Sequence, residues 1–370
     1  MKASTKAMGA PGVVRALAGL ATIAPSERMA IAVRHLWQAG MLGGAHLRQA
    51  TSLATGTPLL FTDLLALGRA DLSVARVYEG HVNAMQLVAR YGSDCQQKRA
   101  EETADRGGML GVWGADDPGD PGRLVEAKGN RVLAGRKTFA SGAGVVELAV
   151  IAVKTEGGAT QIVLVDGHKL AGRFDVSWWQ PIGMQATNSF AVDLTNITVG
   201  KQDLLGSLGD YHEQPFFGAG AIRFVAGHLG GALAVGDATR NHLVQSGRHG
   251  DPHQALRLGQ MTAELEAAFC YVRAAYVRVA PSIAWTACER SLTDPLIADS
   301  ARVHMEGAAE RIMALATRTV GCAGLMTTHP LARSLCDLTV YLRQPAPDAA
   351  VVRLGKSVGE GLYRAAFDDH

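Results

Sequence analysis

Phe139 and Ser141 lie two residues apart in the segment Gly135–Gly142, which reads Gly-Arg-Lys-Thr-Phe-Ala-Ser-Gly. An aromatic ring beside a hydroxyl donor is the pair that a flat redox cofactor needs. The ring requires an apolar contact, and the charge that develops on reduction requires a hydrogen bond. A strand aromatic followed by a turn serine would give the same residues, so the segment alone leaves both interpretations open.

Three further segments carry groups that could contact such a cofactor. Upstream, Asp-Asp-Pro-Gly at 116–119 is a favourable turn, and it follows residues whose ring and backbone amides could line a loop: Trp113, Gly114 and Ala115. Further along the chain, arginines stand near the ends of predicted helices, at Arg248 and at Arg318 shortly before Gly321. An arginine fork at Arg248 suits bidentate binding of phosphate, although Arg248 could also be a solvated helix-end cation.

The elements that must position these residues fall into three blocks along the chain. Apolar residues recur at helical spacing from Pro25 to about Arg106, and Pro25 itself is a plausible helix start. Short β-branched runs separated by polar turns follow, at 131–133, 148–153, 161–165, 174–178 and 190–199. Helical periodicity then returns at 223–247, 252–280, 294–321 and 331–342.

This order predicts an α+β fold rather than a doubly wound sheet, because the strands are grouped between helical blocks. We expect an N-terminal helical domain at 1–107, a middle antiparallel β-barrel or sandwich at 108–205, and a C-terminal four-helix bundle at 206–370. No Gly-x-Gly-x-x-Gly follows a predicted strand, so a Rossmann site has no support.

With this order of domains, the segments together resemble the acyl-CoA dehydrogenase family over nearly the whole chain. Gly135–Gly142 is similar to the family's flavin-ring segment, and Gly183–Ser189 is similar to the turn that leads into its last strands. The resemblance implies a bound FAD, with Phe139 against the isoalloxazine and Ser141 hydrogen-bonded near its reactive nitrogen. The family's loop threonine is not retained, but that loop would be formed here by Trp113, Gly114 and Ala115.

The same resemblance implies a cofactor shared between subunits. Arg248 matches an arginine that pairs with the cofactor pyrophosphate across a subunit interface. Arg318 and Gly321 lie in a segment similar to the turn that receives the adenosine end, although Arg318 replaces a glutamine and Cys322 replaces a glycine. These departures weaken the case for FAD over FMN. The shared site implies a homodimer or homotetramer.

The residue that defines dehydrogenase chemistry is missing. In the family, a glutamate removes the α-proton of an acyl thioester while the flavin takes a hydride. Ile222 occupies one of its two usual positions, directly before Arg223, and the segment 337–348 contains neither the glutamate nor the glycine-threonine that follows it.

Three interpretations remain open. The first is an FAD-dependent oxidoreductase that carries out α,β-dehydrogenation of a CoA- or carrier-bound acyl substrate, with Asp348 as a displaced base, unless that residue is only a helix cap. The second is a flavin-dependent monooxygenase of the same fold, served by a reductase, in which His81 and Ser141 support the flavin chemistry. A lone histidine on an apolar helix is also a common core residue. The third is a structural relative without catalysis.

Composition sets limits on other functions. Lys plus Arg number 36 against 34 Asp plus Glu, with no long basic run, so nucleic-acid binding is not expected. The five cysteines form no Cys-x-x-Cys pair, which predicts neither a disulfide framework nor a zinc or other metal site, and indicates a cytoplasmic protein. Arg15 interrupts the one stretch that could mimic a signal peptide, and no uncharged apolar run reaches the length of a membrane span.

Overall fold

The computed structural model describes residues 9–20, 22–52, 56–127, 129–285 and 291–364, with the side chains of residues 9–11 left out. The chain divides into two compact units. Unit 1 holds the residues up to Ala50 together with Arg76–Pro181 and Gln185–Glu213; unit 2 holds Thr51–Ala75, Ile182–Met184 and the chain from Gln214 onward. This division interleaves the two units in sequence and so differs from the three consecutive domains that we expected.

The helices of unit 1 come from the predicted helical block. They are α1 (Gly9–Ala18), α2 (Pro25–Gln38), α3 (Gly44–Ala50), α6 (Asp94–Asp105) and most of α5 (Leu72–Tyr91). Pro25 opens α2 as predicted, and Ser93 caps α6 in a reciprocal box with Gln96, which satisfies donors that the first turn would leave unpaired. Residues 81–89 of α5 are almost all buried, so this helix forms the centre of the helical part of unit 1.

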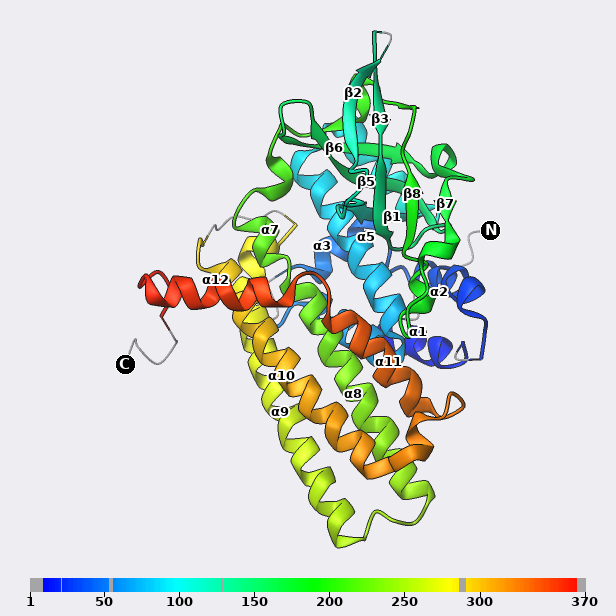
Figure 1. The fold of residues 1–370 in the computed structure, drawn as a ribbon, viewed down its shortest axis with the longest axis vertical. Helices are drawn as coiled ribbons and strands as arrows, with labels where there is room; N and C mark the ends of the chain where they lie inside the picture. Colours follow the sequence, from blue (N-terminus) through cyan, green and yellow to red (C-terminus); the bar gives the residue numbers. More distant parts are fainter. Residues whose placement is uncertain (1–8, 21, 53–55, 128, 286–290, 365–370) are drawn as a thin grey trace. The chain divides into compact units, whose positions relative to one another are not determined.

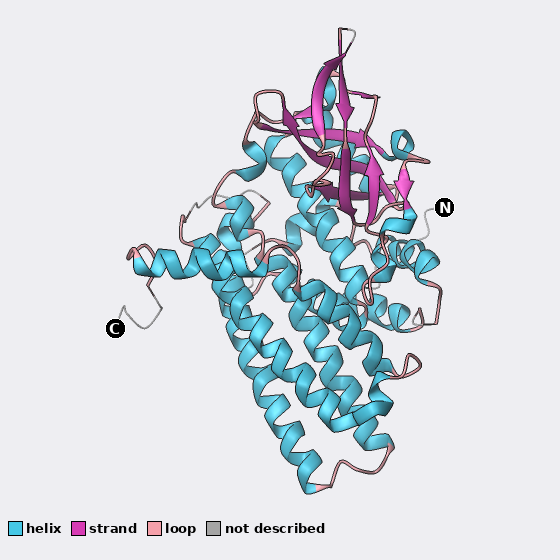
Figure 2. Ribbon diagram, in the orientation of Figure 1, coloured by secondary structure: helices cyan, strands magenta, loops and turns pink. Residues whose placement is uncertain are grey.

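The strands of unit 1 form two sheets, drawn in magenta in Figure 2. One sheet contains β1 (Met109–Trp113), β2 (Arg123–Ala127), β3 (Asn130–Ala134), β5 (Val146–Thr155), β6 (Thr160–Asp166), β9 (Ile197–Thr198) and β10 (Leu204–Leu205). The other contains β4 (Arg136–Ala140), β7 (Phe174–Asp175) and β8 (Phe190–Asp193). Leu133, Ile151 and Val192 belong to the apolar core of this β-rich part.

The β-rich domain is confirmed, with two refinements. Most strand pairs are antiparallel, as in the β5–β6 ladder where Val150 lies opposite Leu164, but β1 and β2 both pair with β5 in parallel. The predicted strand at 174–178 is two residues long and continues as a 3-10 turn, and the run at 190–199 is split into β8 and β9.

Unit 2 is helical. Its elements are α4 (Leu59–Ala70), α7 (Phe216–Ala219), α8 (Ile222–Gln245), α9 (Pro252–Val279), α10 (Asp294–Val320), α11 (Pro330–Leu342) and α12 (Pro347–Gly359). The four predicted helices of the second half are therefore confirmed within two residues at each end. Helices α8, α9 and α10 run side by side in Figure 1, and α12 packs across α10. Helix α12 was not predicted, because Pro345 and Pro347 suggested an irregular segment.

Close packing of α4 on α8 depends on glycine. A Cβ added to Gly68 would lie 2.5 Å from the carbonyl oxygen of Gly227, a separation that real side chains do not adopt. Arg69 and Asp237 add a two-bonded ion pair between the same helices, with distances of 2.5 and 2.8 Å. By length and composition the stretch Phe216–Gln245 could cross a membrane, but 67% of its apolar window is buried, as for the core helix of a folded unit.

Candidate functional site

A buried lysine fixes the loop that precedes the predicted cofactor segment. Lys137 on β4 is 0% exposed, and its ammonium donates to the carbonyls of Gly114 (2.9 Å) and Ala152 (2.6 Å) and to the carboxylate of Asp116 (2.6 Å). Burial lowers the pKa of Lys137, and the hydrogen bond that Lys137 donates to Asp116 opposes that shift. The backbone amide of Thr138 also donates to the carbonyl of Ala115. Gly114 and Ala115 are thus held against β4.

Phe139 lies in a bulge of β4 and points out of the sheet. The pairing of β4 with β8 shifts register between Lys137 and Ala140, and Phe139 has a φ of 53°, in the left-handed region that costs an aromatic residue energy. The ring is 41% exposed and stands perpendicular to Trp178, with centroids 4.8 Å apart. Trp179 stacks on Trp178 and also meets Phe139 edge-on. Together, Phe139, Trp178 and Trp179 form an aromatic surface.

Ser141 begins a chain of hydroxyl groups. Its Oγ lies 2.8 Å from Oγ of Ser189, which in turn lies 2.7 Å from Oγ1 of Thr187. Ser189 and Thr187 are buried, whereas Ser141 is half-buried, so the chain reaches the surface at Ser141. Each hydroxyl can donate and accept a hydrogen bond, so the chain can orient or relay a proton at Ser141.

Trp113 is buried beside the segment that contains Ser141. Its side chain is 1% exposed, packs edge-on against Phe174, and donates from Nε1 to the backbone carbonyl of Ser141 at 3.0 Å. Trp113 thus positions the main chain of Ser141 from within the core, and its contact with a cofactor stays a prediction.

His81 lies inside the core. The residue is 0% exposed; Nε2 lies 2.9 Å from the carbonyl of Leu42, and Nδ1 accepts the backbone amide of Leu110 at 3.0 Å. Burial lowers the pKa of His81 to about 4, and the bond to Leu42 opposes this shift. Both ring nitrogens contact backbone groups, and a role of His81 beside a flavin stays a prediction.

A polar cluster on α5 was missed. The carboxylate of Glu79 is buried, accepts from Arg76 at 2.6 Å, and also accepts from the amide of Asn83. Burial raises the pKa of Tyr211 to about 12, and the negative charges of Glu79 and Asp116 act in the same direction. Tyr211 therefore stays a hydroxyl donor. The spacing of Arg76, Glu79 and Asn83 places them on one helix face and could have predicted the cluster. The same spacing is also typical of solvated ion pairs on a helix surface.

In unit 2, the residues predicted to bind the pyrophosphate and the adenosine end of the cofactor lie at the ends of helices. Arg248 is exposed between α8 and α9. Arg318 is exposed on the last turn of α10, where it lines an open hollow of about 830 Å³ together with Arg311 and Glu264. Gly321 ends α10 with a φ of 73°. The structure does not test whether these residues bind a nucleotide, so that role stays a prediction.

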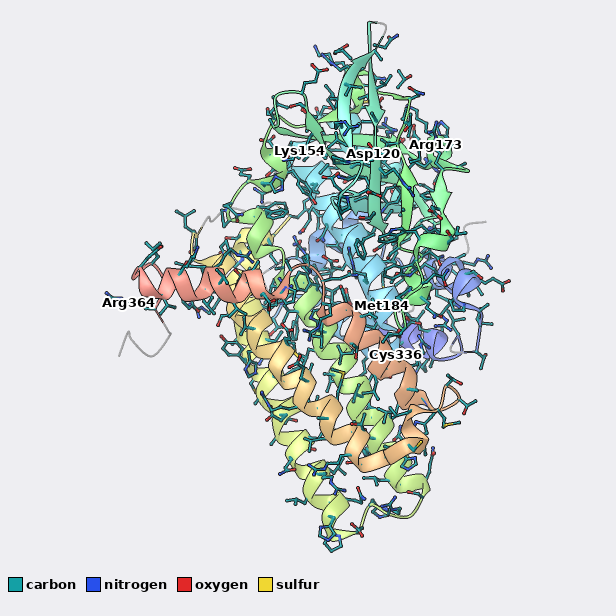
Figure 3. All side chains as sticks on the ribbon, viewed as in Figure 1. Asp120, Lys154, Arg173, Met184, Cys336 and Arg364 are labelled. Atoms are coloured by element: carbon teal, nitrogen blue, oxygen red, sulfur yellow. The ribbon has the colours of Figure 1, made fainter. Side chains whose placement is uncertain are left out.

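The predicted turn at 183–189 is anchored by α11. Asp337 accepts the backbone amide of Met184 at 2.5 Å and lies 3.5 Å from Arg333, which also pairs with Asp71. A Cβ on Gly183 would lie 2.2 Å from the backbone carbonyl of Cys336, so only glycine fits there. Figure 3 labels Met184 and Cys336 at this contact.

The two positions for a catalytic glutamate offer no carboxylate directed at a site. Ile222 opens α8 and is fully buried among apolar residues. Asp348 is exposed in the first turn of α12, where a negative charge stabilises the start of a helix. The N-cap of α12 is Ala346 and not Asp348, and the role of Asp348 as a base stays a prediction.

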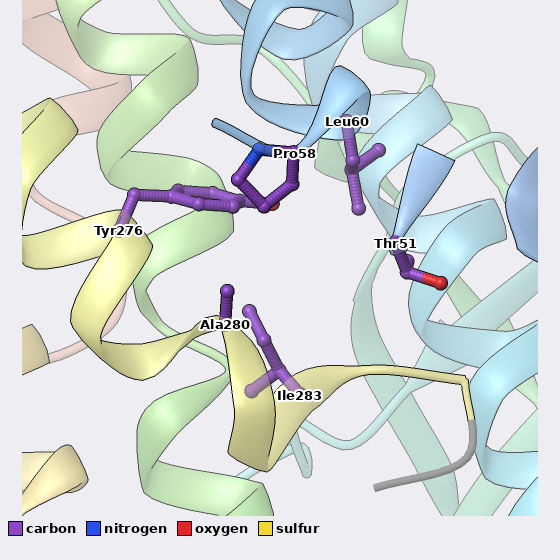
Figure 4. A pocket seen from close by; sticks show the side chains of 6 residues that line it. All are labelled: Thr51, Pro58, Leu60, Tyr276, Ala280 and Ile283. Carbon is purple, nitrogen blue, oxygen red and sulfur yellow. The ribbon is translucent and has the colours of Figure 1, made fainter. Parts of the chain in front are cut away.

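Two other features of the described residues provide no site. The hollow in Figure 4, lined by Thr51, Leu60, Tyr276 and their neighbours, is too narrow to admit water. Among the described residues, no group of three histidine, cysteine or acidic side chains could hold a metal ion. Cys95, Cys270, Cys322 and Cys336 are free thiols, and Cys288 lies outside the described residues.

The described residues of unit 1 fit a flavin ring. Phe139 offers an exposed aromatic surface, and Ser141 offers a hydroxyl that is not enclosed by other side chains. The strained φ of Phe139 is a further sign, since such strain persists mainly at functional sites. The residues that would hold the ring are Phe139, Ser141 and the backbone at Gly114 and Ala115.

The chain is similar in fold to several solved structures. Over 94% of this chain and 96% of the other, the chain is similar to the FMN-bound dibenzothiophene monooxygenase TdsC from Paenibacillus sp. A11-2, at 16% identity and a TM-score of 0.78. It is similar to the methanesulfinate monooxygenase MsuC from Pseudomonas fluorescens at 21% identity and a TM-score of 0.76, over 94% and 95% of the two chains. It is also similar to a nitrososynthase from Micromonospora carbonacea var. africana at 19% identity and a TM-score of 0.75, over 94% of each chain.

These proteins have the acyl-CoA dehydrogenase fold, and the chain shares it. No protein-family model matches the sequence. No curated protein sequence matches it.

Proposed function

We propose that this chain, whose fold is that of the acyl-CoA dehydrogenases, is a flavin-dependent monooxygenase acting on a small organic molecule. The proposal rests on one contrast: the groups that suit a flavin are present, whereas the carboxylate base of a dehydrogenase is missing from its usual positions. The aromatic surface and the hydroxyl chain that suit a flavin are built in unit 1. The carboxylate that dehydrogenation requires is missing at Ile222, and Asp348 is exposed on α12.

Each group has a role that its environment supports. Phe139 would provide the flat contact, and Ser141 would hold a proton or a hydrogen bond at its Oγ, steadied by Ser189 and Thr187. Lys137 would keep the loop at Gly114 and Ala115 in place. None of these roles requires removal of an α-proton, so the missing glutamate does not contradict a monooxygenase.

When bound and reduced, the flavin would supply the two electrons with which one oxygen atom of O2 enters the substrate and the other leaves as water. We propose FMN in place of the FAD that the family resemblance implied. FMN is bound in the TdsC structure and in that of KijD3, a further protein to which the chain is similar. In addition, Arg318 and Cys322 depart from the family's adenosine-binding pattern. We propose that a separate reductase is the source of reduced flavin.

Spectroscopy of the purified protein tests the proposal. A flavin spectrum that appears on purification, or after addition of FMN, keeps the enzyme interpretations, whereas a colourless protein that takes up neither FMN nor FAD supports a structural relative. Reduced protein mixed with O2 should show a transient absorbance band before the oxidised spectrum returns. Anaerobic bleaching by an acyl-CoA panel would instead establish a dehydrogenase and refute the proposal.

Two associated expectations are tested on the same sample. An Asp348→Asn variant that loses anaerobic bleaching would restore the role of Asp348 as a base. We also propose a homodimer or homotetramer. Light scattering that shows only monomer would remove the interfacial roles of Arg248, Arg318 and Gly321.

A further inference from the structure

Helix α10 carries a buried arginine that lacks an ion-pair partner. Arg302 is 4% exposed, and within the described residues no carboxylate lies in ion-pair distance of it. One Nη donates to the backbone carbonyl of Pro345, the guanidinium lies over the Phe224 ring at 5.3 Å, and Nε has no acceptor. Burying an unpaired charge is strongly unfavourable, so such a group calls for an anion.

The nearest carboxylates are already committed to other arginines. Asp299, one turn before Arg302, receives two hydrogen bonds from Arg353 at 2.8 and 2.9 Å. Glu306, one turn after it, pairs with Arg343 at 2.9 Å. Asp299 and Glu306 are therefore each hydrogen-bonded or paired with another arginine, and neither lies within ion-pair distance of Arg302.

A buried histidine shares the same aromatic ring. His228 on α8 is 1% exposed, lies 5.4 Å from Phe224 between ring centroids, and meets the Tyr341 ring edge-on at 4.5 Å. Burial lowers the pKa of His228 to about 3, and Arg302 lowers it further, so the ring is neutral.

The free nitrogen of His228 has a defined role. The ring forms a hydrogen bond with the backbone of Tyr341, and Nε2 is buried without a partner among the described residues. A neutral ring that donates from Nδ1 to a backbone carbonyl carries a lone pair on Nε2. Nε2 can therefore accept a hydrogen bond from an N–H or O–H group of a ligand.

We propose that Arg302 and His228 form a binding site in unit 2 for a small oxyanion that also carries a hydrogen-bond donor, such as a hydroxycarboxylate. Arg302 binds the oxyanion, and His228 Nε2 accepts from the donor of the same molecule. Phe224, which is half-buried, supplies the apolar side of the site. The site goes beyond the proposed function and does not rest on it.

Matched probes test the two halves of the site separately. Glycolate carries a carboxylate and a hydroxyl, and acetate carries the carboxylate alone. We expect glycolate to raise the thermal midpoint of the full-length protein at constant ionic strength and to bind on the order of tenfold more tightly than acetate, because a site built for a hydroxyl rejects the analogue without it.

Variants of three arginines and the histidine complete the experiment. Arg302→Met should abolish the midpoint shift by both probes, and His228→Phe should remove the preference for glycolate. Arg311→Met on the same helix is the control, because Arg311 is exposed and pairs with Glu264, and it should bind both probes as the parent does. If Arg302→Met does not fold, Arg353→Met serves instead. It frees Asp299 to compete for Arg302 and should weaken both probes.

The outcomes separate this inference from the proposed function. A protein that binds glycolate but takes up no flavin retains the site and loses the oxygenase. A parent protein whose midpoint responds to glycolate no more than to sodium chloride overturns the site, as does an Arg302→Met variant that binds glycolate unchanged, whatever the flavin spectrum shows.

Discussion

Replacing Lys137 by methionine should destabilise unit 1 by about 2–4 kcal/mol. The side chain is fully buried, and methionine keeps its length while removing donors to two carbonyls and one carboxylate. Each buried acceptor left unpaired costs about 1–3 kcal/mol. The Asp116 carboxylate, with 33% of its side chain exposed, regains water, and removal of a buried ammonium offsets part of the loss.

Urea unfolding followed by tryptophan fluorescence measures this effect, with Lys154→Met as the matched control. Lys154 is exposed and donates one hydrogen bond to Thr160, so its replacement should change the free energy of unfolding by about 0.5 kcal/mol or less. Flavin affinity should also fall more for Lys137→Met than for the control, because the loop at Gly114 loses its anchor.

The pH dependence gives an independent check. The pKa of Lys137 is lowered in the folded protein, so above that pKa the unfolded chain binds more protons than the folded one. The parent should therefore gain stability relative to Lys137→Met as the pH rises from the lowered pKa toward the ordinary lysine value. Equal stability of the two lysine variants, or a parent that loses stability over this range, would refute the reasoning.

Three further changes have defined outcomes. Ser141→Ala should lower flavin-dependent oxygenation by about 10–100-fold in steady-state assays while fluorescence titration shows a smaller change in flavin affinity, since one donor is lost and the aromatic contact remains; an equal loss in affinity would contradict this. Gly183→Ala should cost about 3 kcal/mol or more in thermal unfolding, because the new methyl group meets the carbonyl of Cys336, and an unchanged midpoint would show that the turn is not fixed there. The folded-state pKa of His81 is about 4 and lies below its unfolded value, so the parent should lose on the order of 3 kcal/mol as the pH falls from 6.5 to 4, and His81→Phe should lack this loss.

The sequence predicted the helices of the second half well, because each has a continuous apolar face. The limits of α9, at Pro252 and Val279, differ by one residue from the expectation. Short strands were harder. β9 and β10 are two residues long, and their pairing with β3 and β6 depends on contacts distant in sequence. Periodicity cannot detect a period in two residues.

The candidate site was only partly predictable, because sequence spacing does not say which side of an element is buried. Phe139 is exposed and Ser141 is half-buried, whereas Trp113 and His81 lie in the core. Arg302 gave no signal at all. With acids one turn before and after it, it has the pattern of a solvated helix surface, and only the packing around α10 shows that those acids are occupied.

The interleaving of the two units sets a constraint on synthesis. Arg69 on α4 finds its partner Asp237 on α8 168 residues later in the chain. At 5–20 residues per second, α4 would leave the ribosome roughly 8–34 s before the helix on which it packs. During that time the apolar side of α4 has no permanent neighbour, so the nascent chain is exposed to chaperones and to aggregation, and truncation before α8 should yield insoluble protein.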